Sequence, residues 1–450
     1  MMKRILLTLL VAVVLIGAAV LAWGLWPTST REIDASAFDL EDPELIADGE
    51  YLMHASDCVA CHAPKAADSF TGGLPIATPI GAIYSTNITP DKDTGIGDYS
   101  LNDFDRALRH GIRPDGATIY PAMPWPAYAR MTDHDIAALY AYFMHGVAPM
   151  QAENRAPDIA WPMNMRWPLA FWRKAFGPGA DAVFDPSRFD DDVVARGAYL
   201  VEGPGHCGTC HTPRAATLQE VALDDRGDGF LAGGAAVDGY IPYNLRGDEG
   251  SGLGLWSEED IARTLSTARN AHAAVIGPPM QDVVAHSLQY LTPEDITAIA
   301  RYLKTLSPAG DQAARFTPGD TATASALARG ETSSRGGEVF LDSCAACHFS
   351  AGTGTTDAIP GLAGNPTVLT EDPSSLIRLI LTGDTLPRTE ERPNTLGMPR
   401  FDWRLDDDEV AEVLTFIRTG WGNDAPEVTA EEVAEVRAHL KDDTETADQR

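Results

Sequence analysis

The sequence predicts an all-α protein in which three small helical domains follow one another behind an N-terminal transmembrane helix. Three observations predict this fold class. The chain begins with a long uncharged apolar run, its six cysteines fall in three copies of one five-residue pattern, and a capped amphipathic helix follows each copy. No region shows the sustained alternation of apolar and polar residues that is typical of half-buried strands.

Length and composition limit the classes of protein to which the chain can belong. With 450 residues, 44% of them hydrophobic and 22% charged, it is too apolar to be disordered. Its 34 basic and 65 acidic residues give a formal net charge of −31, which argues against binding to nucleic acid or to anionic lipid head groups. The acidic surface indicates a basic docking partner or a salty habitat, and charge alone does not choose between them.

The N-terminus has the pattern of a membrane anchor. Lys3 and Arg4 precede an uncharged run from Ile5 to Trp26. As a helix this run would be about 33 Å long, close to the thickness of a bilayer core. The two basic residues predict a cytoplasmic N-terminus and place the rest of the chain outside the cytoplasm. The alternative is a cleaved signal peptide with Val20-Leu21-Ala22 at the cleavage site. Both interpretations export residues 30–450.

The three cysteine pairs and the segments between them predict the domain boundaries. Segment 151–188 is rich in Pro, Trp and Gly and is predicted to be an irregular linker. It is either an ordinary connection or a contact surface for a partner or a membrane. Segment 308–330 is predicted to be a flexible linker. The remaining units are the anchor or signal segment at 1–30, the three domains at 40–150, 189–307 and 331–423, and an acidic tail at 424–450.

The first two domains share a second, ungapped similarity between residues 87–108 and 244–265. This similarity indicates that the two domains are duplicates. Within it, Gly250–Gly254 superficially resembles a dinucleotide-binding loop, but it lacks a preceding strand and a following helix, so we predict a repeated turn. The matched pairs are Asn87/Asn244, Asp91/Asp248, Gly95/Gly252, Gly97/Gly254, Ser100/Ser257, Asp103/Asp260, Arg106/Arg263 and Leu108/Leu265.

Each domain is predicted to begin and to end with a helix. The terminal helix starts at an N-cap acceptor, which is followed three residues later by an acid and then by apolar residues at helical spacing. The first helix runs directly into a cysteine pair. The predicted N-caps are Thr132, Thr292 and Asp406, and the first helices contain Gly49, Gly197 and Gly337.

The repeated cysteine pattern is C-x-x-C-H, the attachment signature of a c-type haem. Two thiols at positions i and i+3 of one helical turn can form thioethers with the two vinyl groups of one porphyrin, and the adjacent histidine can bind the iron. The pattern therefore predicts three covalently bound haem c groups. The predicted attachment residues are Cys58, Cys61, Cys207, Cys210, Cys344 and Cys347, and the predicted proximal ligands are His62, His211 and His348.

Two other uses of C-x-x-C fit the sequence less well. A zinc ribbon requires paired knuckles, whereas these pairs lie a whole domain apart. A thioredoxin-like redox site requires a βαβ pattern, which is not evident.

A second axial ligand is predicted from three methionines that lie in Pro/Gly turns before the terminal helices. Ligation by His and Met raises the reduction potential and closes the iron to substrates, which indicates electron transfer. A lone methionine is otherwise usually core filler. The predicted ligands are Met123, Met280 and Met398. The alternatives are Met131 and Met144 in the first domain and His272 and His286 in the second.

With these motifs the chain resembles the three-haem cytochrome c subunit of bacterial membrane-bound periplasmic dehydrogenases. That family serves quinoprotein alcohol dehydrogenases and flavin-dependent gluconate, sorbitol and fructose dehydrogenases. The resemblance covers roughly residues 45–420 and implies three cytochrome c-like haem domains. Its most specific stretches are 72–81, 85–91, 94–97, 120–124 and 286–292.

The resemblance implies a role in electron transfer. Electrons would pass from a catalytic subunit of the flavin or pyrroloquinoline quinone type, through three haems, to ubiquinone or the respiratory chain. It also implies an inner-membrane location with the haem domains in the periplasm. Some members are thought to use apolar C-terminal helices as anchors; this C-terminus is polar and acidic, so the N-terminal helix would anchor the chain.

No substrate-oxidising site of the chain's own is evident from the sequence, so whether it is itself an enzyme stays open. One alternative is a stand-alone membrane-anchored carrier between a quinol-oxidising complex and a terminal oxidase. Another is a haem enzyme such as a peroxidase, which would require an open iron position.

Overall fold

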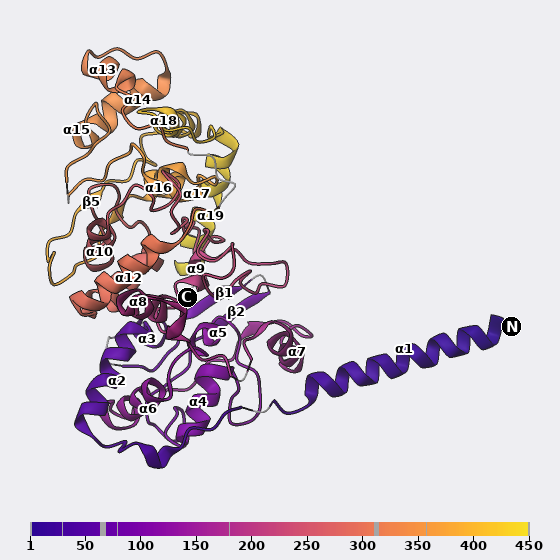
Figure 1. Cartoon of the computed structure of the whole chain (residues 1–450). Helices are drawn as coiled ribbons and strands as arrows, with labels where there is room; N and C mark the ends of the chain where they lie inside the picture. Colours follow the sequence, from indigo (N-terminus) through magenta and orange to yellow (C-terminus); the bar gives the residue numbers. More distant parts are fainter. Residues whose placement is uncertain are drawn as a thin grey trace. The chain divides into compact units, whose positions relative to one another are not determined.

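The computed structural model describes residues 2–28, 30–63, 69–78, 80–179, 181–309, 315–356 and 358–448, and these residues are mostly helical (Figure 1). They form two compact units. The first contains Met1–Met53 and Cys61–Asp185, and the second contains His54–Ala60 and Pro186–Arg450.

The first unit is built on α2 (Pro43–Ala55) and α6 (Asp133–Ala141), which cross at Gly49. A Cβ atom at Gly49 would overlap the carbonyl oxygen of Ala138, so only glycine allows this close approach. The predicted N-cap is confirmed, because the Thr132 hydroxyl accepts a hydrogen bond from the Asp135 N–H. The other helices of this unit are α1 (Met2–Leu25), η1 (Ala35–Ala37), α4 (Leu101–His110), α5 (Trp125–Tyr128), η2 (Tyr142–Gly146) and α7 (Trp167–Phe176). The short helix α3 (Cys58–His62) is divided, with Cys58–Ala60 assigned to the second unit and Cys61–His62 to the first.

Among the described residues, Arg4–Gly24 of α1 is the one stretch long and apolar enough to cross a membrane. Its side chains are exposed almost throughout, because they pack against little protein. A long apolar helix that leaves most of its length exposed is what an anchor or a signal sequence requires.

Short strands interrupt the helical architecture that the sequence predicts. The order β1 (Pro75–Thr78), β2 (Gly81–Tyr84), β3 (Asp158–Ile159) forms an antiparallel sheet in the first unit. A second antiparallel pair, β4 (Asp384–Thr385) with β5 (Gly397–Met398), lies in the second unit. These strands have two to four residues each, too few for a recognisable period of two.

Both predicted linkers contain regular structure. Segment 151–188 includes β3 and the ten-residue helix α7, so the expectation of an irregular linker is wrong for this stretch. Its Pro168 lies in the first helical turn, where the missing N–H costs nothing. Segment 308–330 includes α13 (Ala322–Ala328), an alanine-rich turn of good helix formers. Residues 310–314 of that segment lie outside the described residues.

The second unit begins with a helix pair that repeats the first crossing. Gly197 of α8 (Asp192–Glu202) lies against the Ala298 carbonyl of α12 (Pro293–Thr305). The Thr292 hydroxyl caps α12 as predicted, accepting from the Asp295 N–H. The elements between and around them are η3 (Pro186–Arg188), α9 (Gly208–His211), α10 (Glu258–Thr267), α11 (Pro278–His286) and η4 (Leu288–Tyr290).

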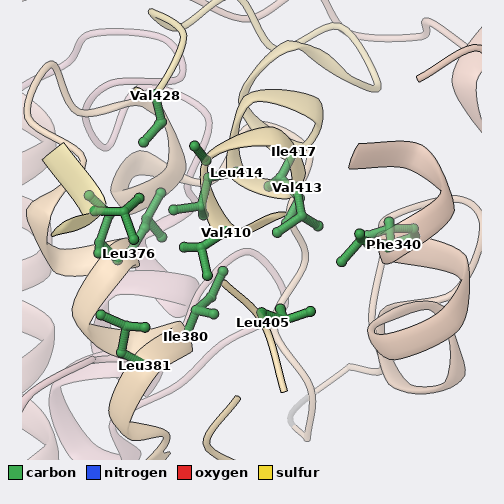
Figure 2. Packing of buried hydrophobic residues seen from close by; sticks show 14 of the residues in the cluster. Phe340, Leu376, Ile380, Leu381, Leu405, Val410, Val413, Leu414, Ile417 and Val428 are labelled. Atoms are coloured by element: carbon green, nitrogen blue, oxygen red, sulfur yellow. The ribbon is translucent and has the colours of Figure 1, made fainter. Parts of the chain in front are cut away.

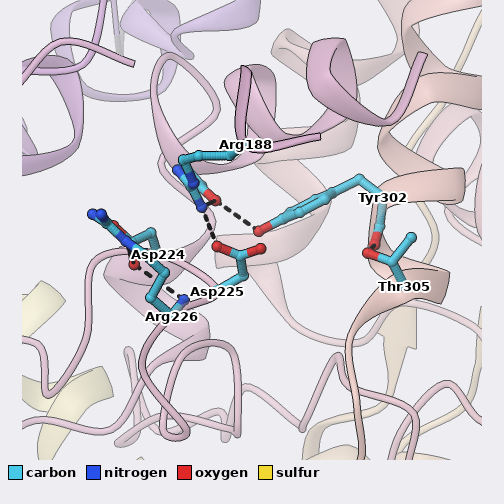
Figure 3. Close-up of polar contacts among 7 residues, drawn as sticks. Arg188, Asp224, Asp225, Arg226, Tyr302 and Thr305 are labelled. Atoms are coloured by element: carbon cyan, nitrogen blue, oxygen red, sulfur yellow. Dashed lines mark hydrogen bonds and ion pairs between the residues drawn. The ribbon is translucent and has the colours of Figure 1, made fainter. Parts of the chain in front are cut away.

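A buried polar network fastens η3 to this helix pair (Figure 3). Arg188 pairs with the fully buried carboxylate of Glu202 at 3.0 Å and also with Asp225. The Tyr302 hydroxyl donates to the same carboxylate over 2.8 Å. Burial, followed by the charge of Glu202, raises the pKa of Tyr302 well above its usual value, so the phenol remains a donor.

The last part of the second unit has its own apolar core (Figure 2). Val410, Val413 and Leu414 of α18 (Asp407–Thr419) pack with Phe340 of α14 (Arg335–Ser343) and with Ile380 of α17 (Ser374–Thr382). Asp406 forms the predicted capping box with Glu409 at the start of α18. The remaining helices are α15 (Ala345–His348), α16 (Pro366–Leu369) and α19 (Ala430–Asp448).

The predicted acidic tail takes part in this core. Val433 and Val436 of α19 are buried in the cluster, and α19 packs against α17 and α18. The acidic residues of α19 therefore lie on a helix that is held by its apolar face.

A third glycine crossing joins α14 and α18 at Gly336, the residue before Gly337 in the predicted first helix. A Cβ at Gly336 would overlap the Glu412 carbonyl oxygen. The two glycines are adjacent, and only the structure shows which one faces the partner helix. Each of the three glycines also lies next to an aromatic residue of the partner helix, four positions after the carbonyl that it contacts. These aromatic residues are Tyr142 for Gly49, Tyr302 for Gly197 and Phe416 for Gly336.

Candidate haem-binding sites

Each cysteine pair lies on one short helical turn directly after the first helix of its region. The turns are α3, α9 and α15, and the last two are preceded by Cys207 and Cys344 at the N-cap. All six thiols are free of disulfides. Residues at i and i+3 of a helix lie on the same face, so each pair presents both sulfurs to one side.

Burial keeps several of these thiols protonated. It raises the pKa of Cys207 to about 12 and the pKa of Cys210 and Cys344 to about 11. At neutral pH these cysteines are therefore neutral thiols in the protein without haem.

The histidine after each pair is held in the same way at all three turns. Its Nδ1 atom lies within hydrogen-bond distance of a backbone carbonyl oxygen: 2.7 Å from Thr86 for His62, 2.8 Å from Tyr243 for His211, and 3.1 Å from Pro360 for His348. A carbonyl can only accept, so Nδ1 carries the proton. The lone pair of Nε2 is then free to bind a metal.

Burial also favours the neutral form of these imidazoles. It lowers the pKa of His62, His211 and His348, and the bond to the carbonyl opposes it only in part. Neutral imidazole is the form that binds iron.

The repeated segment of the first two regions explains how the carbonyls are positioned. Thr86 and Tyr243 each stand directly before the asparagine that opens the repeat, Asn87 or Asn244. The side-chain oxygen of each asparagine accepts from the backbone N–H two residues later, that of Thr89 or Arg246. Sequence reasoning missed the two carbonyl acceptors of this contact, although their place beside the first matched residue was a usable signal.

The rest of the repeat folds identically in both copies. The Asp91 carbonyl accepts from the N–H groups of Gly95 and Gly97, and the Asp248 carbonyl accepts from the N–H groups of Gly252 and Gly254. Capping boxes at Ser100 and Ser257 then start α4 and α10. The predicted turn, rather than a dinucleotide loop, is confirmed at Gly250–Gly254.

The three predicted methionines occupy three different local structures. Met123 lies in a turn directly before α5, as expected. Met280 is instead in the first turn of α11, because Pro278 and Pro279 are well tolerated at a helix start. Met398 is in the two-residue strand β5, opposite Asp384 of β4. Each is only partly buried, so each side chain has a solvent-side or cavity-side surface.

The alternative ligands lie in other local environments. Met131 is fully buried in the core of the first unit. Met144 lies within η2, which continues the terminal helix. The His272 Nε2 atom lies 3.3 Å from Asp260, and its ring stacks on Trp256. His286 ends α11.

Asp384 connects the segments that carry Met280 and Met398. Its Oδ2 atom accepts from the Gly277 N–H at 3.0 Å and from the Gln281 side-chain amide at 2.8 Å, which places it at the start of α11. Its backbone is paired with Met398. Asp384 therefore links both methionine segments of the second unit, through its carboxylate to α11 and through its backbone to β5.

Three buried hydrogen-bond donors in the first two regions have no partner in the part of the protein that the structure describes, and a c-type haem could supply their acceptors. Among the described residues, the Tyr120 hydroxyl and the Trp125 indole N–H are buried without a hydrogen-bond partner, and they flank Met123 in the sequence. The Trp256 indole N–H, in the second region, is also buried and unpaired. Buried donors nearly always have an acceptor. The two propionate groups of a haem are acceptors of the right kind.

Helical regions with a C-x-x-C-H turn and a histidine oriented by a backbone carbonyl define the class of c-type cytochromes. The comparisons with known proteins agree. The cytochrome c family model matches residues 46–146 and 333–421, which contain the first and third cysteine pairs.

Three curated relatives extend the match over most of the chain. The gluconate 2-dehydrogenase cytochrome c subunit of Pantoea cypripedii is 53% identical over 93% of this chain and 95% of its own length. The cytochrome c subunit of the quinone alcohol dehydrogenase of Gluconobacter oxydans is 49% identical over 88% of this chain and 83% of its own length. The fructose dehydrogenase cytochrome subunit of Gluconobacter japonicus is 39% identical over 87% of this chain and 82% of its own length. The chain belongs to the cytochrome c family, in the group of dehydrogenase cytochrome subunits, and membership implies covalently bound haem c.

Proposed function

We propose that the chain is a three-haem electron-transfer subunit that takes electrons from the catalytic subunit of a periplasmic dehydrogenase. The observation that carries this proposal is the threefold arrangement of cysteine turn, histidine and backbone carbonyl. The similarity to three dehydrogenase cytochrome subunits supports the role as a subunit.

Each haem c, when bound, supplies a one-electron redox couple at its iron. The chain's residues attach, orient and shield it. The pairs Cys58/Cys61, Cys207/Cys210 and Cys344/Cys347 would form the thioethers. His62 with Met123, His211 with Met280, and His348 with Met398 would supply the axial ligands. With both ligands in place the iron would have no open position for substrate or peroxide, which favours electron transfer over substrate oxidation at the haems.

The positioning of the axial residues determines their function. The carbonyls of Thr86, Tyr243 and Pro360 keep each imidazole in one tautomer and one orientation. Asp384 keeps the Met280 and Met398 segments together, so the second and third haems would lie in neighbouring parts of one unit. That arrangement favours direct transfer of an electron between them.

The electron donor is a catalytic subunit of the flavin or pyrroloquinoline quinone type, and the acceptor is ubiquinone or a terminal oxidase. The chain is held at the inner membrane by an uncleaved α1, with residues 30–450 in the periplasm. The packing of α7 against α1 supports an anchor that stays with the mature chain.

Purification from membranes in mild detergent tests this function. We expect a flavoprotein or quinoprotein to co-purify in stoichiometric amount, and its substrate to reduce the haem bands only in the presence of that partner. Co-purification with a quinol-oxidising complex and an oxidase, without a dehydrogenase, would instead establish a stand-alone carrier. Reduction of the isolated chain by alcohols or sugars would overturn the assignment as a non-catalytic subunit.

A further inference from the structure

Helix α7 and the segment before it form an exposed surface in the first unit. Its apolar side chains are Trp161, Met163, Met165 and Trp167, exposed by 78%, 56%, 37% and 48%. None of the residues of α7 is buried. A contiguous exposed set of large apolar residues marks an interaction site. We call these four residues, with Arg166, Arg173 and Lys174, the α7 surface.

One side of α7 is fixed to the body of the unit. The Trp172 ring packs edge-on against Trp125, with ring centroids 6.0 Å apart. A Cβ at Gly177 would lie 2.8 Å from the Trp125 ring, so the helix end is also close to it. Trp125 follows Met123 by two residues. The helix is therefore a built part of the first unit, and it lies on the segment that carries a proposed iron ligand.

A second side of α7 is fixed to the C-terminal end of α1 (Figure 1). Phe171 lies so close to Gly24 that a Cβ there would overlap its ring, and it packs edge-on with Trp23 at 6.2 Å. Lys174 donates to the Trp23 carbonyl at 2.6 Å, and Arg173 donates to the Thr28 hydroxyl at 3.1 Å. These contacts set α7 at the level where the apolar span ends.

The charge of this stretch is opposite to that of the whole chain. Residues 159–180 contain Arg166, Arg173 and Lys174 and no acid, in a chain with a net charge of −31. Basic residues beside exposed tryptophans and methionines, next to the end of an apolar helix, match the head-group region of a bilayer.

From the continuity with α1 and this local charge, we infer that the α7 surface lies in the head-group layer of a bilayer containing anionic phospholipid. The inference rests on the proposed anchoring by α1. It adds a second contact between the first unit and the bilayer, which would hold the Met123 segment near the membrane surface.

Site-directed spin labelling of the full-length haem-loaded chain in vesicles tests the inference. The six native cysteines are consumed by haem attachment, so an introduced cysteine is the one free thiol. Labels at Trp161→Cys and Met163→Cys report the α7 surface. Trp403→Cys, exposed by 74% in the second unit, is the matched control, and Val11→Cys in α1 reports the anchor. The readout is the relative accessibility of the label to oxygen and to a water-soluble nickel complex.

In vesicles that contain phosphatidylglycerol, we expect the oxygen-to-nickel ratio at positions 161 and 163 to exceed that at 403 several-fold. The difference should shrink in vesicles of phosphatidylcholine alone, and with Lys174→Gln. Water-like ratios at 161 and 163 with a membrane-like ratio at 11 would overturn the α7 inference and leave the anchor intact. A water-like ratio at 11 would overturn the anchor itself. Shielding at 161 and 163 that requires the catalytic subunit would show a protein contact instead of lipid.

Discussion

Single backbone atoms determine the tautomer of the residues expected to bind iron. At each cysteine turn the histidine Nδ1 is bound to one carbonyl, and within the described part of the chain no acidic side chain shares this task. A neutral carbonyl orients the ring without making the imidazole strongly basic, as a carboxylate would. A carbonyl partner therefore favours an imidazole that donates only modest electron density to the iron. Together with the proposed methionine as the second ligand, it favours a high reduction potential.

Outside the haem regions, His110 is the residue whose protonation should most affect stability. It is 8% exposed at the end of α4. Burial, together with the charges of Arg109, Arg173 and Arg31, lowers the pKa of His110 to about 4. In the unfolded chain a histidine titrates near 6.5. Between pH 4 and pH 6.5, His110 therefore binds fewer protons in the folded state than in the unfolded state. Its contribution to the unfolding free energy is fully present above about pH 6.5 and is lost as the pH decreases toward 4.

We expect the unfolding free energy of the first unit to decrease by about 2 kcal/mol between pH 7 and pH 5 because of this one residue. Urea denaturation at both pH values measures the difference. His110→Gln should remove most of it, whereas His145→Gln, at an exposed histidine of the same unit, should not. An unchanged pH dependence in His110→Gln would show that other groups cause it.

At the scale of elements, each helix crossing depends on a glycine that faces a carbonyl of the partner helix. The exclusion of any Cβ lets the two backbones approach and places an aromatic ring beside the glycine. Gly197 is the clearest case, since it lies between the Ala298 carbonyl and Tyr302, whose hydroxyl is part of the buried network with Glu202.

Gly197→Ala should destabilise the second unit by about 1–3 kcal/mol, because the added methyl group forces the helices apart. Thermal or urea unfolding of the haem-loaded chain measures the effect. Gly179→Ala is the matched control, since a Cβ there meets nothing within 4 Å. Equal stability of the two variants would mean that the crossing tolerates a side chain.

Asp384 offers a test of the link between α11 and the β4–β5 pair. Asp384→Asn removes a charge-assisted acceptor for Gly277 and Gln281, an interaction of roughly 1.5–3 kcal/mol. We expect lower stability and altered potentials at the second and third haems, with the first unchanged, in a spectroscopic redox titration. Glu391→Gln, the same charge change at an exposed residue, should alter neither. A shift at the first haem only would contradict the link.

Some of the helices could be predicted from the sequence, and others could not. The terminal helices and their caps at Thr132, Thr292 and Asp406 were predictable, since capping is local chemistry. Helix α7 was not, because its aromatic residues show no clear apolar face and its order depends on contacts with Trp125 and α1. The place of Met280 inside α11, the choice of Gly336 over Gly337 and the carbonyl of Pro360 likewise depend on tertiary neighbours that no local pattern encodes.

At the scale of the whole molecule, the cysteine count and the charge have separate consequences. The proposed attachment of three haems would use all six cysteines and leave no thiol for another function. The net charge of −31 indicates either docking to a basic partner surface, which salt would weaken by screening, or adaptation to a salty habitat. The basic α7 surface is the local exception, and it adjoins the apolar helix.

The number of covalently bound haems per chain tests the central claim most directly. Intact-protein mass spectrometry, combined with a haemochrome assay on the full-length chain, should give three haem groups. Replacing Cys58/Cys61, Cys207/Cys210 or Cys344/Cys347 by alanine should remove one haem in each case. Two haems in the native chain, or an unchanged count after Cys207→Ala with Cys210→Ala, would contradict the account.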